Sequence, residues 1–102
     1  MAEYFLVRRV RGPAWDHARA LRHQDGWDEH AAFMDGLAER SIIVLGGPVG
    51  AGDGDHFLLV VDLESEAAVR ARLGDDPWSN DMLRIESVQP WQVWLRAGEA
   101  GA

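Results

Sequence analysis

Cysteine is absent from the 102-residue sequence, and all ten basic residues are arginine. Without cysteine, the chain can form no disulfide, thiolate zinc site, iron–sulfur cluster or thiol nucleophile. No apolar run approaches the ~18 residues that span a membrane, so we expect no membrane partner. The net charge is −7. Because coating nucleic acid needs clustered cations, we also expect no nucleic-acid partner.

The length and the composition are those of one ordinary globular domain. We expect this domain to cover residues 1–96 and the small, polar residues 97–102 to form a disordered tail. The first residues lack a basic stretch followed by an apolar one, which predicts a cytoplasmic protein.

Hydrophobic patterns predict the elements of the first half of the chain. Residues 4–10 are β-branched and aromatic, as in a strand. Asp25 is the expected N-cap of a helix that runs to about Arg40, because apolar residues then recur at helical spacing. Residues 41–46 are apolar on both faces, which predicts a central strand that Pro48 closes. The stretch 14–24 remains ambiguous.

The second half repeats the pattern of strand, helix and strand. Residues 50–55 form a turn before a strand over 56–63. Ser65 is the expected N-cap of a second helix, which Gly74 ends. After the turn around Asp76, a last strand is expected over 82–95 with an interruption at Pro90.

The resulting β-α-β-β-α-β order predicts an α+β fold of the ferredoxin-like kind. In it a four-stranded antiparallel sheet carries two helices on one face. The strands at 42–45 and 57–63 are apolar on both faces, yet the helices cover only one of them. We therefore expect a homodimer in which two sheets pack face to face.

Several motifs favour structural explanations over ligand binding. The glycine-rich stretch 46–52 lacks the spacing of a nucleotide-binding loop and leads into a strand, which favours a hairpin. His17, His23 and His56 show no metal-ligand spacing, and the loop at 53–55 is too short to bind calcium. We therefore expect no metal.

His30 is the histidine with the most informative position. It shares the apolar face of its expected helix with Phe33, Met34 and Leu37. One interpretation is a core histidine with a satisfied hydrogen bond. The other is a general acid–base residue with a carboxylate partner. Asp76 is the candidate partner, although an Asp-Pro pair is also a common turn.

Tryptophan is frequent, with five residues in the chain. Trp27 and Trp78 flank the two candidate site residues, so they could line a pocket for an aromatic ligand. The long connection over 11–26 could form a wall of the same pocket. In that case Trp15, Arg22 and Trp27 would shape its specificity.

Several features in this order together resemble the YCII-related family of the dimeric α/β-barrel superfamily, over residues 4 to about 95. They are His30 opening the first helix, Gly46-Gly47-Pro48, Glu64-Ser65 opening the second helix, Asp76-Pro77-Trp78, and Val88-Gln89-Pro90-Trp91. The chain departs from the family at Ser41, where the first helix ends and the family usually has glycine.

The resemblance implies a ferredoxin-like protomer that dimerises through its sheet, with a site built on His30 and Asp76. The family includes a dehydrochlorinase that acts on a chlorinated hydroxyquinol, and the superfamily includes muconolactone isomerase. These relatives imply proton transfer on a small ring compound without a cofactor. The leading hypothesis is thus a lyase- or isomerase-like enzyme that binds its substrate with Trp27, Trp78 and Arg22. The alternative is a non-catalytic homodimer that binds a small ligand.

Overall fold

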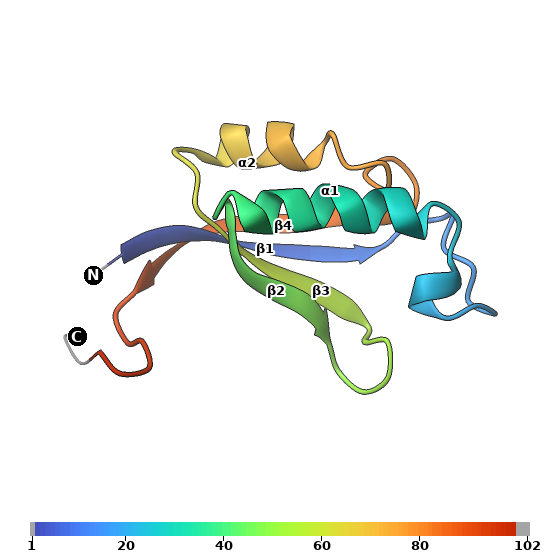
Figure 1. Ribbon diagram of the computed structural model, residues 1–102, viewed down its shortest axis with the longest axis horizontal. Helices are drawn as coiled ribbons and strands as arrows, with labels where there is room; N and C mark the ends of the chain where they lie inside the picture. Colours follow the sequence, from blue (N-terminus) through green and yellow to red (C-terminus); the bar gives the residue numbers. More distant parts are fainter. Residues whose placement is uncertain (1, 100–102) are drawn as a thin grey trace.

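A four-stranded antiparallel sheet carries both α-helices on one face (Figure 1). The computed structural model describes residues 2–99. The strand order is β2-β3-β1-β4, so the predicted ferredoxin-like arrangement is confirmed. In chain order the elements are β1 (Ala2–Arg11), the 3-10 helix η1 (Leu21–His23), α1 (Trp27–Glu39), β2 (Ile43–Val49), β3 (His56–Val61), α2 (Glu66–Leu73) and β4 (Leu83–Val93).

Three predictions about the strands are wrong, and all of them concern the edges of the sheet. β2 is an edge strand, although its sequence predicted a central one. Pro48 lies within β2 opposite Phe57, and Pro90 lies within β4 opposite Phe5 without interrupting it. An edge strand tolerates proline because the N–H groups on its open side have no ladder partner to lose.

The N-terminus of α1 differs from the prediction, whereas that of α2 confirms it. Gly26 is the N-cap of α1, in a left-handed conformation with φ 77°. The Asp25 carboxylate instead accepts a hydrogen bond from Arg19 Nη1 at 3.1 Å. At α2, Ser65 Oγ accepts from the Ala68 N–H at 3.0 Å, as a side-chain cap should.

The C-terminus of α1 is closed by a Schellman motif. The Ile42 N–H donates to Leu37 O at 2.9 Å, and the Ser41 N–H donates to Ala38 O at 3.0 Å. This motif requires a left-handed residue, and Ser41 supplies it with φ 60°. Glycine would adopt that φ without strain, which accounts for the residue type that the resembled family has here.

The connection between β1 and α1 is ordered by one buried amide. Gln24 is 3% exposed. Its Nε2 donates to Asp16 O at 2.7 Å and to Arg19 O at 2.9 Å, and its Oε1 accepts from the Asp16 N–H at 3.0 Å. The Leu21 N–H donates to Asp53 Oδ2 at 2.8 Å, which ties η1 to the β2–β3 hairpin. This connection was ambiguous from the sequence because its bonds are side chain to backbone.

The β2–β3 connection is the predicted hairpin. Gly54 has a φ of 78°, and a Cβ there would lie 2.8 Å from Val49 O. Gly46 is needed for a different reason, since its Cβ would lie 2.6 Å from Leu59 Cδ2. The glycines of this stretch therefore serve turn geometry and close packing.

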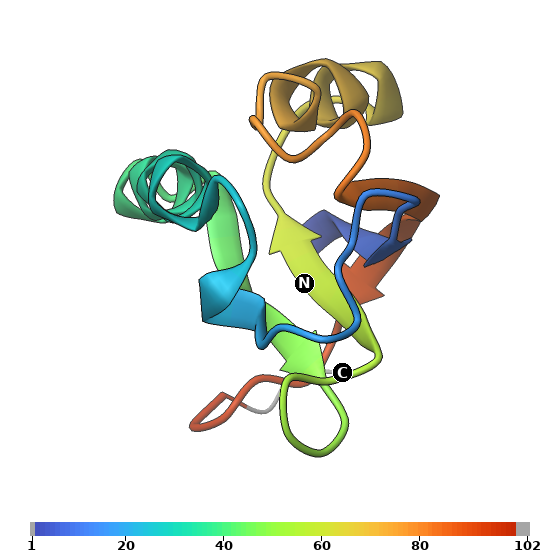
Figure 2. The same ribbon diagram turned by 90° about the vertical axis from the view of Figure 1, so that its right-hand side faces the viewer.

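Buried apolar side chains form two clusters between the sheet and the helices. The larger one joins both helices to the sheet and contains Val7, Leu37, Ile43, Leu59, Val61, Val69, Leu73 and Val88. The smaller one contains Trp15, Phe57, Trp78, Met82 and Leu83. The smaller cluster draws its residues from the β1–α1 connection, the start of β3 and the segment before β4. The β1–α1 connection and the N-terminus of α1 lie at the right-hand end of Figure 1, which faces the viewer in Figure 2.

The C-terminal residues of the described chain form a turn. Arg96 and Glu99 make an isolated bridge around Ala97 and Gly98. Residues 100–102 of the predicted tail lie outside the described residues. The disorder of the tail therefore stays a prediction.

The sheet face opposite the helices carries apolar side chains. Leu6 pairs with Val60 across the centre of the sheet, and strand alternation turns both away from the helices because Val7 and Leu59 are in the core. Trp91 on β4 is 43% exposed and Leu45 on β2 is 63% exposed. Monomeric proteins rarely expose apolar patches of more than a few hundred Å².

We therefore predict that the chain dimerises through this face. Sedimentation at micromolar concentration should give about twice the mass of one chain. Trp91→Glu should shift the protein toward the monomer, because it places a charge in the apolar interface. Ala32→Glu, on the exposed side of α1, is the matched control and should leave the dimer intact. A wild-type monomer would contradict the prediction.

Candidate functional site

His30 lies in the second turn of α1 with its imidazole toward the sheet. It is the fourth residue of the helix Trp27–Glu39, and its N–H donates to Gly26 O at 3.0 Å. Leu37, seven residues later on the same helix face, is 1% exposed. The His30 side chain is 10% exposed. The helix thus carries the ring inward without sealing it completely.

Asp76 lies in the connection between α2 and β4 and is held by its own neighbours. Its N–H donates to Leu73 O at 3.1 Å, and its Oδ1 accepts from the Trp78 N–H at 2.9 Å. This local bond is typical of Asp in a turn. The side chain is fully buried, so its orientation is set before any ligand arrives.

The two predicted site residues meet, although 46 residues separate them in sequence. His30 Nδ1 lies 2.9 Å from both Asp76 Oδ1 and Asp76 Oδ2. Because a carboxylate can only accept, Nδ1 must carry a proton, and in the neutral ring Nε2 is then the acceptor. Nε2 makes no hydrogen bond within residues 2–99, and the side chain is not completely sealed from solvent. The predicted proximity is confirmed, and the role of the pair stays a prediction.

Arg9 is a third member of this site that sequence analysis did not select. Its Nη1 donates to Asp76 Oδ2 at 2.9 Å, and the residue is only 1% exposed. It lies on β1 at the inward position that follows Phe5 and Val7. A charged residue at an inward strand position was the signal that could have identified it.

The electrostatics of the group favour an ionised Asp76. Burial opposes ionisation and is the largest single effect on its pKa. The hydrogen bonds from His30 and from the Trp78 N–H, with the charges of His30 and Arg9, together outweigh burial and lower the pKa of Asp76 below its usual value. The carboxylate therefore balances the charge of Arg9 and orients the imidazole.

Two tryptophan rings pack against the His30 ring. The Trp78 ring stacks on it with centroids 4.1 Å apart and planes 8° apart, and the Trp27 ring lies 5.8 Å away. Trp78 is fixed in turn, because its Nε1 donates to Asp25 O at 2.8 Å. Gly26 allows this approach, since a Cβ there would lie 3.1 Å from Trp78 Nε1.

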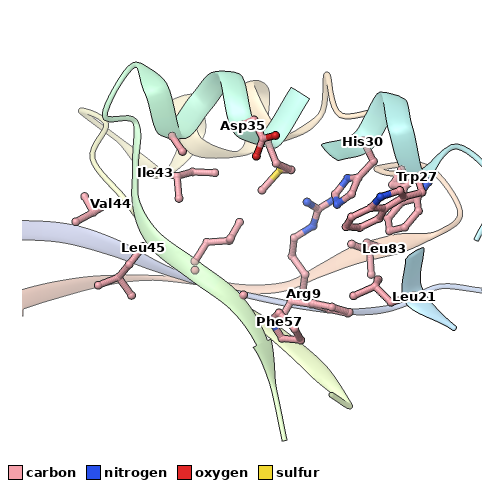
Figure 3. A pocket seen from close by; sticks show the side chains of 17 residues that line it. Arg9, Leu21, Trp27, His30, Asp35, Ile43, Val44, Leu45, Phe57 and Leu83 are labelled. Carbon is pink, nitrogen blue, oxygen red and sulfur yellow. The ribbon is translucent and has the colours of Figure 1, made fainter. Parts of the chain in front are cut away.

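A cavity of about 370 Å³ opens in front of His30 (Figure 3). This volume is typical of small-molecule sites. Its charged or titratable lining residues are Arg9, His30 and Asp35, and the rest of the wall is largely apolar. That wall includes Leu21, Trp27, Met34, Ala38, Ile43, Val44, Leu45, Pro48, Phe57, Leu59, Trp78 and Leu83. Asp76 is not among the lining residues, so it lies behind His30 and Arg9.

The other predicted binding residues divide into two groups. Trp27 and Trp78 line the cavity as expected. Arg22 does not, because it is exposed on η1 and only its neighbour Leu21 faces the cavity. Adjacent residues of a 3-10 helix point about 120° apart, so both cannot face the same wall. Trp15 packs against Trp78 at 5.9 Å in the smaller core cluster and does not line the cavity.

Residues 2–99 contain no cluster of three or more His, Asp or Glu side chains that could hold a metal ion. In the same part of the chain, no helix is both long enough and apolar enough to cross a membrane.

Comparison with known proteins finds a similar fold. No family model matches the chain, and no curated protein sequence matches it. Among solved structures, the chain is similar to a 5-chloro-2-hydroxyhydroquinone dehydrochlorinase from Burkholderia phenoliruptrix in complex with 2,5-dihydroxybenzoquinone. The chains are 21% identical, the match covers 90% of this chain and 93% of the other, and the TM-score is 0.52. The likeness supports the ferredoxin-like fold.

The lowered pKa of Asp76 predicts how stability depends on pH. Its ionised form is favoured in the folded state, so this stabilisation is complete above its unfolded pKa of about 3.9 and is lost as pH falls through the lower folded value. Asp76→Asn should therefore flatten the acid side of the stability curve. It should also cost roughly 3–5 kcal/mol at neutral pH, because Arg9 stays buried without its counter-charge.

Urea unfolding at a series of pH values would measure this effect. Asp75→Asn is the matched control, since Asp75 is exposed. The control should keep both the neutral-pH stability and the acid slope of the wild type. Equal acid slopes for wild type and Asp76→Asn would show that Asp76 is not held ionised by the fold.

Proposed function

We propose that the chain is a small, cofactor-independent enzyme that moves a proton on a small substrate, by a lyase- or isomerase-like reaction. The observation that carries the proposal is the geometry of His30. Nδ1 is bound to the buried Asp76 carboxylate at 2.9 Å, while Nε2 has no partner within residues 2–99 and the ring lines the cavity. A histidine oriented by a carboxylate and open on its other nitrogen is suited to general acid–base catalysis.

In the proposed reaction, His30 Nε2 takes a proton from a carbon or an oxygen of the substrate. Asp76 stabilises the imidazolium that forms but does not itself take the proton. In an isomerisation, Nε2 returns the proton to another substrate atom. In an elimination, the electron pair of the broken C–H bond forms a double bond, and a leaving group departs with the electrons of its own bond.

The cavity wall supports a ring-shaped substrate. Trp27, Trp78 and Phe57 line it, and aromatic side chains bind flat rings by offset stacking or by edge contacts. The structurally similar dehydrochlorinase is named for a chlorinated hydroxyhydroquinone and was solved with a benzoquinone. An aromatic or ring-derived substrate therefore belongs to the proposal. Membership of the YCII-related family, the homodimer and a cytoplasmic location are proposals as well.

A second candidate is a non-catalytic homodimer that binds a small ligand. The observation that favours it is the burial of the ionic group, since Arg9 is 1% exposed and Asp76 is 2% exposed. In this candidate the ionic group has a structural role, because it joins β1, α1 and the segment before β4. His30 would then be a hydrogen-bonding residue of a binding site.

The first candidate predicts that the protein turns over a substrate, and the second predicts that it only binds one. We predict that the wild-type protein releases chloride from 5-chloro-2-hydroxyhydroquinone, or catalyses exchange of ring protons with deuterated solvent in enolisable cyclic ketones. His30→Gln should reduce this rate roughly 10²–10⁴-fold, because it removes the group that carries the proton. Chloride release under anaerobic conditions and proton NMR would measure the two reactions.

His23→Gln is the matched control, because His23 is exposed on η1 and should not affect the rate. Wild-type protein that binds ring ligands but accelerates neither reaction above the His30→Gln variant would favour the binding protein. A loss of rate in His23→Gln equal to that in His30→Gln would contradict the assignment of the acid–base residue.

A further inference from the structure

Only one nitrogen of the Arg9 guanidinium is hydrogen-bonded within the described residues 2–99. Nη1 donates to Asp76 Oδ2, but Nε and Nη2 are buried and have no hydrogen-bond partner within residues 2–99. An unpaired donor on a buried group destabilises the folded state, and the penalty is larger for a charged group than for a neutral one. Folded proteins rarely leave such donors without a partner.

Asp76 accepts from Nη1 but makes no hydrogen bond with Nε or Nη2. Its two oxygens already accept from Arg9 Nη1, from His30 Nδ1 and from the Trp78 N–H. A partner for Nε and Nη2 must therefore come from elsewhere. Arg9 lines the cavity, and Figure 3 shows its side chain rising from the sheet to the His30 ring. The cavity is the space from which that partner would arrive.

We propose that Arg9 makes the cavity selective for ring compounds with an anionic oxygen, either a carboxylate or an ionised phenol or enol. Charge-assisted hydrogen bonds to a guanidinium are shorter and stronger than neutral ones. Because Asp76 offsets the charge of Arg9, the anion is attracted mainly by these directed bonds. The proposal deepens the proposed function, since it names the substrate class of the same cavity.

The position of Arg9 also relates the anion to the acid–base residue. Arg9 and His30 bind the same carboxylate, and both residues line the cavity. An oxygen bound by Arg9 would bring adjacent ring atoms toward His30 Nε2. Asp35, the other charged residue of the cavity, is exposed. Its repulsion of an anion is therefore screened by solvent.

The experiment compares pairs of probes of similar shape and different charge. Benzoate and benzamide differ in the anionic oxygen, and 4-nitrophenolate and 4-nitroanisole differ likewise at mildly alkaline pH. Wild-type protein, titrated calorimetrically, should bind at least one anion about tenfold more tightly than its neutral partner. Preference within the first pair would indicate a carboxylate ligand, and within the second an ionised phenol. Equal affinity within both pairs, or no binding of either anion, would overturn the proposal.

Arg9→Lys tests the residue itself. An ammonium can pair with Asp76, but it lacks the fork that binds two acceptors at once. The affinity ratio of anion to neutral probe should fall close to one. Arg84→Lys, at an exposed position on β4, should keep the wild-type ratio. An unchanged ratio in folded Arg9→Lys would overturn the proposal.

A measurement on the wild-type protein covers the case in which Arg9→Lys fails to fold. The Arg9 Nε–H resonance should shift downfield as the preferred anion saturates the protein, and it should not shift with the neutral probe. A resonance that stays unmoved at saturation would overturn the proposal. Because these tests measure binding without turnover, they can succeed where the proposed acid–base reaction fails, and the reverse also holds.

Discussion

The buried carboxylate of Asp76 is the interaction on which the site depends. It accepts hydrogen bonds from β1 through Arg9, from α1 through His30 and from its own turn through the Trp78 N–H. A carboxylate removed from water must be paired and hydrogen-bonded to stay ionised. Three segments that are distant in sequence are therefore held at one end of the sheet by the requirements of a single charge.

In this arrangement one side of the site faces the cavity and the other side is buried in the protein. Asp76 lies behind and does not line the cavity, whereas His30 and Arg9 line it. Two nitrogens of the Arg9 guanidinium are buried and have no hydrogen-bond partner within residues 2–99. The Trp78 ring stacks on the imidazole, and the Trp27 ring packs against it at a tilt. A preorganised polar group at the base of an apolar cavity is the usual form of a small-molecule site.

Most of the fold could be predicted because its signals are local. The cap at Ser65, the glycine turns of the hairpin and the helical spacing after His30 each depend on residues close in sequence. The errors arose where the answer depends on distant partners. A strand that is apolar on both faces can be central, or it can be an edge strand with an exposed apolar face, as β2 is. Likewise, whether Asp25 caps a helix depends on the competing Arg19.

By itself, the sequence determined the six main elements, the ferredoxin-like order and the candidate pair of His30 and Asp76. Only the tertiary structure decided that Arg9 completes that pair and that Arg22 points away from the cavity. The physical reason is the range of the interactions. Alternation along β1 turns Arg9 inward, but the charge that it meets there lies 67 residues further along the chain. No local sequence pattern predicts that Arg9 binds Asp76. Nor does one predict that two guanidinium nitrogens have no hydrogen-bond partner within residues 2–99.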